Sequence, residues 1–203
     1  MKSIIITSLF LAILLISCNS ISEEQKTQAK EFNNSIVALT YPITDDINKL
    51  LSISKQVINN AINNTFSQND LDLFWEEYNI LIENIDKNSK ELKSLSEFDN
   101  EVKLKESGVK YLSDCRSILN NEYKELIELT NKPFDTEVQY RMSELLIIIL
   151  EKILDTEKST KELQKKLAEK YSFNLAKDTQ DWEKVEQQIK MAKEQLKLMI
   201  NYK

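Results

Sequence analysis

The sequence predicts an all-α protein: an antiparallel up-down bundle of four long helices, with an additional C-terminal helix and an apolar N-terminal segment before the bundle. Three observations predict this fold class. Apolar residues recur at steps of three and four over most of the chain, which places them on one face of a helix. The 203 residues include one Gly and two Pro, so few turns are encoded. No alternating run of β-branched and aromatic residues indicates a strand.

The first predicted helix begins at about Glu23 and is interrupted at Pro42. Proline disfavours helical geometry at the preceding residue and removes a backbone donor, so we predict a kink or a restart there. Beyond it a regular stripe comprises Ile43, Ile47, Leu50, Ser54, Val57 and Ala61. The Asn-rich residues 59–64 end this helix.

The second predicted helix begins near Ser67 or Asn69, which are good N-caps, and ends near Leu95. Its stripe comprises Leu71, Phe74, Tyr78, Leu81, Ile85, Asn88, Leu92 and Leu95. Asn88 is the one polar member. It either fixes the register of the helices or marks a bundle end that water reaches, and we favour the second interpretation.

The third predicted helix has Asp99 as its cap and carries Val102, Val109, Leu112, Leu119, Tyr123 and Leu126. Gly108 lies inside it. Because a Gly in a helix interior is unfavourable by about 0.5–1 kcal/mol relative to Ala, we expect a close helix contact or a local bend there. Asn131-Lys132-Pro133 ends the helix.

The fourth predicted helix starts at Asp135 or Thr136 and carries Val138, Met142, Leu145, Ile149, Ile153, Thr156, Thr160, Leu163 and Leu167. The six consecutive apolar residues from Leu145 to Leu150 cover more than one helix face. This segment is either the most buried part of the bundle, which we favour, or an oligomer or ligand surface.

A last helix is predicted from about Asp178, with Trp182, Val185, Ile189, Ala192, Leu196 and Met199 at three-four spacing. It either docks on the bundle or pairs with a second copy as a coiled coil, which would make a homo-oligomer. We favour docking or a partial extension of the bundle, because six seam positions are few for a coiled coil. The chain thus divides into residues 1–18, a bundle over 19–175 and an amphipathic helix over 176–203.

The first eighteen residues have the features of a signal peptide: Lys2, an apolar run from Ile4 to Ile16, and the small Ser17 before Cys18. The run is too short to span a membrane comfortably. Leu15-Ile16-Ser17-Cys18 resembles the lipobox of bacterial lipoproteins. The resemblance implies cleavage between Ser17 and Cys18 and acylation of Cys18 with fatty acids such as palmitate, which anchors a protein stably when two or more chains are attached. The alternative is a secreted or N-terminally anchored protein with an incidental Cys.

The segment from Asn19 to Glu24 resembles the surface-export signal of Bacteroidota lipoproteins, in which Ser and acidic residues follow the lipidated Cys. It is also consistent with a polar tether and a helix N-cap at Ser22. The two interpretations are compatible. We therefore expect a lipid-anchored envelope protein, at the outer membrane, facing either the cell surface or the periplasm.

Two further segments carry a resemblance to a family. Glu122-Tyr123-Lys124-Glu125-Leu126, and the stretch from Leu167 to Phe173, are similar to uncharacterised helical-bundle surface lipoproteins of Bacteroidota and Leptospira. The lipobox and the four-helix layout agree with this resemblance. It implies a surface or periplasmic lipoprotein and supplies no catalytic or binding residues.

Composition argues against several classes of function. The formal net charge is −6, and basic residues are interspersed with acidic ones, so a nucleic-acid partner is not expected. The chain has no His and a single Gly, which removes the commonest general base and metal ligand and any Gly-rich phosphate loop. We expect no cofactor and no metal site. Cys115 is either a buried small apolar residue, which we favour, or a reactive thiol.

A few side chains are candidates for a site. Glu122, Glu125 and Glu128 lie near one helix face, and carboxylates there can act as acid and base or bind a cation, although a solvated face is the favoured interpretation. Trp75 and Trp182 can stack on sugars or, as we favour, fill the core. A cleft can also receive hydroxyls from Tyr123, Tyr140 and Tyr171.

The expected function is non-catalytic: a lipid-anchored bundle that binds an envelope or surface protein or a glycan, or that acts as a structural spacer. The alternative is an enzyme that uses carboxylates, or a ligand-binding bundle with a cleft between helices. Buried Glu, Asp or Tyr side chains converging on a pocket would favour the alternative, and a sealed apolar core would argue against it.

Overall fold

The computed structural model describes residues 21–63, 65, 67–133, 135–176 and 182–201. The predicted signal segment, including Ser17 and Cys18, lies outside these residues. Within them the chain is helical and contains no strand, which confirms the predicted all-α bundle. None of the helices in these ranges combines the length and the apolar character needed to cross a membrane.

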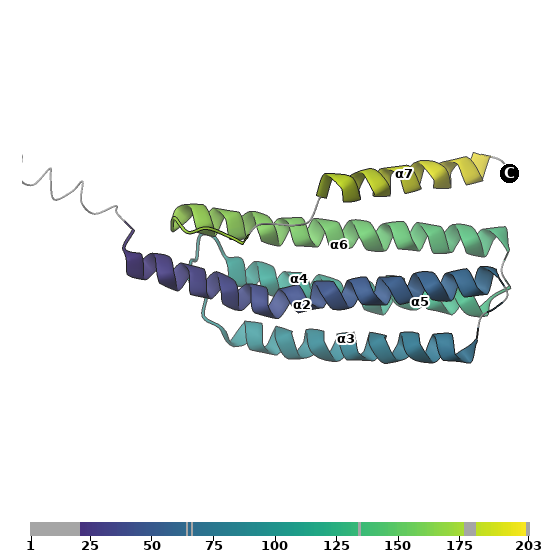
Figure 1. The fold of residues 1–203 in the computed structure, drawn as a ribbon, viewed down its shortest axis with the longest axis horizontal. Helices are drawn as coiled ribbons and strands as arrows, with labels where there is room; N and C mark the ends of the chain where they lie inside the picture. Colours follow the sequence, from purple (N-terminus) through teal and green to yellow (C-terminus); the bar gives the residue numbers. More distant parts are fainter. Residues whose placement is uncertain (1–20, 64, 66, 134, 177–181, 202–203) are drawn as a thin grey trace, which may run out of the picture.

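Four long helical segments form the bundle and a fifth helix lies outside it (Figure 1). The elements are α2 (Glu23–Ile62), α3 (Gln68–Ser94), α4 (Leu104–Ile118), α5 (Lys124–Glu128), α6 (Thr136–Lys170) and α7 (Trp182–Asn201). A π-helical turn, Leu119–Tyr123, joins α4 to α5, and a 3₁₀ turn, Leu129–Asn131, follows α5. These pieces together make the predicted third helix. Neighbouring segments run antiparallel, because the connections between them are short.

The bundle is arranged in layers in Figure 1, with α2 and the α4–α5 segment between α3 on one side and α6 on the other. Gly108 lies where α4 packs closely against both α2 and α3. A Cβ atom there would lie 3.0 Å from Leu92 Cδ2 and 3.2 Å from Ile36 Cγ2. Of the two expectations for Gly108, the close helix contact is therefore the correct one.

α2 continues through Pro42 as one helix, and Figure 1 shows it changing direction near its middle. Pro42 has no N–H for the carbonyl of the preceding turn. Asn88 of α3 donates from Nδ2 to the carbonyl of Leu39, on that turn, at 2.8 Å. The interpretation of Asn88 as a water-exposed bundle end is therefore wrong: the half-buried side chain donates to the backbone of α2 close to Pro42.

The predicted helix cap at Asp99 is also wrong. Its carboxylate accepts hydrogen bonds from the backbone N–H groups of Glu101 and Val102, at 2.8 and 3.0 Å, and so closes a turn before the helix. Lys103 then takes a left-handed conformation, with φ at 55°, and α4 starts at Leu104. The first N–H groups of α4 donate instead to the carboxylate of Glu97. Ser22, in contrast, caps α2 as predicted, in a capping box with Gln25.

The apolar run of α6 is covered on two sides. Leu145 and Ile149 pack in the main core, whereas Ile147 and Leu154 pack against Ile189 of α7. The remaining contacts of this second cluster come from Leu150, Val185, Ala192 and Leu196. The predicted docking of the last helix on the bundle is confirmed. Burial against the main core and α7 explains five of the six consecutive apolar residues, and Ile148 belongs to neither cluster.

Candidate functional site

A groove of about 450 Å³ lies beside the π-helical turn, between that turn and α5 on one side and α6 on the other. It is lined by Asn120, Asn121, Glu122, Lys124, Glu125, Glu128, Arg141, Leu145 and Ile148. A second hollow of about 350 Å³ shares Glu125 and Arg141 with it and extends to Lys132 and Asp135. Both lie at the end of the bundle that is remote from the start of α2. The structure thus brings the three predicted glutamates to one groove.

Arg141 is the central charged group of this groove. It donates to both carboxylate oxygens of Glu125, at 2.7 and 2.9 Å, and to Glu144 at 2.6 Å. The hydrogen bonds from Arg141 lower the pKa of Glu125 below its usual value. Glu125 therefore stays ionised at neutral pH and is a poor proton donor, because general acid catalysis needs a raised pKa.

Glu122 presents an acceptor that the described side chains do not use. Its Oε1 accepts from Lys152 Nζ at 2.5 Å, while its buried Oε2 has no hydrogen-bond partner among the described residues. Glu128 is exposed at the rim. A paired arginine, one spare carboxylate oxygen and nearby amides suit the holding of a polar ligand better than proton transfer.

The aromatic candidates do not converge on this groove. Trp75 is half-buried and makes edge contacts with Phe74 and Tyr78, so it fills the bundle as favoured. The side chain of Trp182 lies outside the described residues. Tyr123 is fully buried with no partner for its hydroxyl among the described residues. Tyr140 is half-buried, and Tyr171 donates to Asp99 at the opposite end of the bundle, at 2.9 Å.

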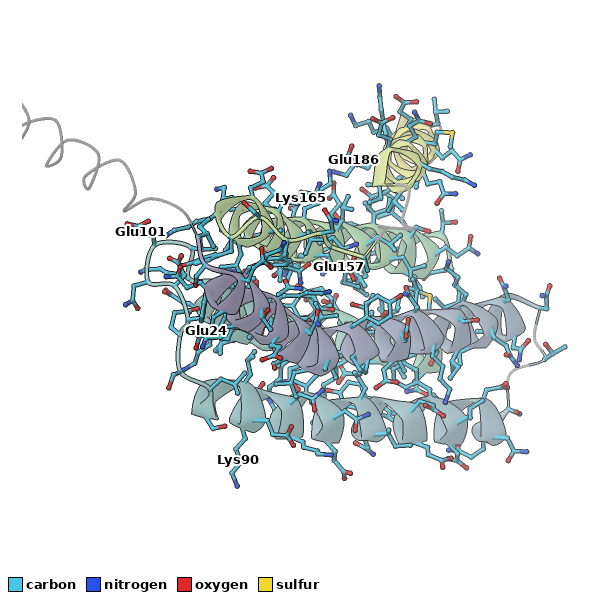
Figure 2. All side chains as sticks on the ribbon, turned by 60° about the vertical axis from the view of Figure 1, so that its left-hand side comes forward. Glu24, Lys90, Glu101, Glu157, Lys165 and Glu186 are labelled. Carbon is cyan, nitrogen blue, oxygen red and sulfur yellow. The ribbon has the colours of Figure 1, made fainter. Side chains whose placement is uncertain are left out.

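A second polar region, which the sequence did not single out, lies between α2, α4 and α6. Tyr111 and Thr44 share a hydrogen bond of 2.6 Å, and Thr40, Glu157 and Thr160 line the same cavity of about 80 Å³. Figure 2 shows Glu157 on the side of α6 that faces α2. Glu157 is only 7% exposed, so the core is not purely apolar at this level.

Burial keeps the hydroxyl of Tyr111 and the thiol of its neighbour Cys115 protonated. It raises the pKa of Tyr111 above its usual range and that of Cys115 to about 12. Tyr111 is therefore a neutral hydroxyl at physiological pH. In the sequence, the only indication of a polar region was the presence of Thr156 and Thr160 in the otherwise apolar stripe of the fourth predicted helix. No periodicity could have placed Thr44 and Tyr111 opposite them, because that pairing depends on how the helices pack.

Cys115 is fully buried, as favoured from the sequence. In the Cys18→Ala protein, which has Cys115 as its single thiol, we expect reaction with a thiol reagent at pH 8 to be slow in buffer and rapid in denaturant. The reason is that the thiolate is the reactive form and burial disfavours it. Absorbance of the released chromophore checks this. Fast labelling of the folded protein would contradict the assignment of Cys115 as an inert core residue.

No family model, curated protein or solved structure matches the chain. In the described part of the chain, no group of three or more Cys, Asp or Glu side chains is arranged to hold a metal ion.

Proposed function

We propose that this protein is a lipid-anchored component of the bacterial cell envelope with a non-catalytic role, in which the bundle holds a binding surface away from the membrane. The expected location is the outer membrane, on its surface or periplasmic side. The resemblance to helical-bundle surface lipoproteins of Bacteroidota and Leptospira agrees with this proposal. The expected partner is an envelope or surface protein or a glycan.

The observation that carries the proposal is the distance along the chain between the anchor and the bundle. Only residues 19–22 separate the predicted lipidated Cys18 from the start of α2 at Glu23. A tether this short keeps that end of the bundle next to the membrane. α2 has 40 residues and so extends about 60 Å at 1.5 Å per residue. The groove beside the π-helical turn then lies at the far end, where a partner can reach it.

A second candidate function is the binding of a small polar ligand in that groove. Its volume is in the range of ligand sites, about 300–1,000 Å³, and Glu122 Oε2 offers a buried acceptor. Substituting Glu122 by Gln should lower the affinity of the protein for such a ligand. A carboxylate enzyme is the less favoured form of this alternative, because Arg141 holds Glu125 ionised.

Changing Cys18 to Ala should leave the bundle folded and release the protein from the membrane. The fold is expected to persist because the described core lies within residues 21–201. Circular dichroism checks the fold, and fractionation of cells checks the location. Recovery of the variant in the membrane fraction, at the level of the unaltered protein, would contradict the anchor.

Protease treatment of intact cells decides which side of the membrane the bundle faces. Loss of the protein while a periplasmic marker survives would place it on the surface, and full protection would place it in the periplasm. The Cys18→Ala protein is the matched control, because it has the same cleavage sites without the anchor.

A further inference from the structure

The two outermost helices of the molecule each expose a pair of apolar side chains seven residues apart. In α3 these are Leu73 and Ile80, which are 41% and 42% exposed. In α7 they are Met191 and Leu198, which are 55% and 57% exposed. Figure 1 shows α3 and α7 on opposite sides of the bundle. Residues seven apart lie on one side of a helix, so each pair forms a short stripe that faces solvent.

The net charges of the two segments that carry the stripes are opposite in sign. Residues 68–86 of α3 contain six carboxylates and no Lys or Arg, and the exposed Glu76 and Glu83 flank its apolar pair. Residues 190–198 of α7 contain three Lys and one Glu. The exposed Lys190 and Lys197 lie next to the apolar pair, Glu194 lies between its two members, and Lys193 pairs with Glu151 of α6. Opposite charges beside apolar positions select partner and orientation in paired helices.

The two stripes also lie at the same level of the bundle. α3 begins, and α7 ends, at the end remote from the start of α2, and in Figure 1 α7 overlaps the first part of α3 along the long axis. The two helices run in opposite directions. A second copy displaced sideways, with its α2 starting at the same end, therefore brings its α3 against α7 of the first. Because the two helices are antiparallel and both pairs are seven residues apart, the contact that we propose sets Leu73 opposite Leu198 and Ile80 opposite Met191.

We propose that α7 of one copy binds α3 of the next, so that membrane-anchored copies associate side by side into open rows. The contact is heterologous, because the two surfaces differ and lie on opposite sides of the molecule, and such contacts propagate. The copies share one orientation only if each is held by the lipid anchor, so this inference rests on the proposed function. One helix–helix contact is smaller than a standard interface, so the association is weak in dilute solution and favoured by confinement on a membrane.

The test uses disulfide cross-linking of the full-length protein carrying both Leu73→Cys and Leu198→Cys. Mild oxidation of membranes should give a ladder of dimers, trimers and higher species, and each single variant should give none. Cys115 is buried and does not contribute. A dimer from Leu198→Cys alone would overturn the proposal in favour of α7 pairing with itself. The absence of a ladder from the double variant would overturn it as well.

Charge reversal supplies the matched control. Lys190→Glu with Lys197→Glu in the double-Cys protein should abolish the ladder, and adding Glu76→Lys with Glu83→Lys should restore it. Failure of the second pair to restore the ladder would overturn the predicted pairing. The same oxidation is made on concentrated Cys18→Ala protein. If fractionation finds the unaltered protein in the soluble fraction, the proposed anchor is wrong. The presence or absence of the cross-linked ladder in concentrated solution then still shows whether α7 binds α3.

Discussion

Substituting Asp99 by Ala is expected to lower the free energy of unfolding by about 3 kcal/mol at pH 7. The Asp99 carboxylate is 5% exposed and ties together the end of the bundle next to the predicted anchor. It accepts from two backbone N–H groups, from Tyr171 at 2.9 Å and from Lys170 Nζ at 2.6 Å. Removing it leaves those donors without their acceptor and loosens the turn that precedes α4. Denaturant unfolding followed by circular dichroism measures the loss.

The effect of Asp99→Ala should depend on pH. Burial alone would raise the pKa of Asp99, but the hydrogen bonds from Lys170, the backbone and Tyr171 outweigh it and lower the pKa to about 2. A carboxyl whose pKa is lower in the folded protein than in the unfolded chain stabilises the fold above the unfolded pKa of about 3.9. This contribution, about 2 kcal/mol, is lost as the pH falls through about 2.

The stability difference between the unaltered protein and Asp99→Ala should therefore be constant from pH 7 to 5 and shrink between pH 4 and 2. Glu101→Ala is the matched control. Glu101 also pairs with Lys170, but its side chain is 85% exposed, so its loss should be within about 0.5 kcal/mol. Equal effects of the two substitutions would contradict the special role of Asp99.

Substituting Gly108 by Leu is expected to lower the free energy of unfolding by about 3 kcal/mol, at the upper end of typical overpacking effects. The atoms beyond Cβ have no space, because Leu92 and Ile36 already lie within 3.0 and 3.2 Å of the Cβ position. The helices must separate to admit the side chain. Thermal and denaturant unfolding measure the change.

Gly108→Ala separates this packing effect from helix propensity. Ala in place of Gly stabilises a helix interior by about 0.5–1 kcal/mol. A small shift of the Leu92 and Ile36 side chains offsets part of this gain, so the net effect should lie within about 1 kcal/mol. A Leu variant as stable as the Ala variant would show that α4 does not approach α2 and α3 as closely as described.

The helices themselves were predictable because their signals are local. The three-four stripe of α3 faces the core, and five of its members are buried: Phe74, Tyr78, Leu81, Ile85 and Leu92. Ser22, Ser67 and Asp135 were recognisable as helix starts, since capping depends on hydrogen bonds that span two or three residues. Glu122, Glu125 and Glu128 shared a face for the same reason.

The groove was predictable only in part. The position of the three glutamates followed from their spacing, but Arg141, which neutralises Glu125, lies sixteen residues further along the chain on another helix. The π-helical turn that shifts the face of the third helix at Leu119 has no distinguishing composition. Tyr111, Thr44 and Glu157 likewise line one cavity although they come from three different helices.

Local pattern was thus sufficient to predict the number and antiparallel order of the helices, and to predict an anchor at Cys18. The packed structure decided what each exceptional residue does. Asn88 provides a donor beside the bend at Pro42, and Gly108 permits a close contact of three helices. Asp99 closes a turn and also accepts a hydrogen bond from the distant Tyr171. The physical reason is that helix periodicity depends on neighbours within a turn or two. Burial and hydrogen bonding of a side chain, in contrast, depend on which distant segment lies opposite it.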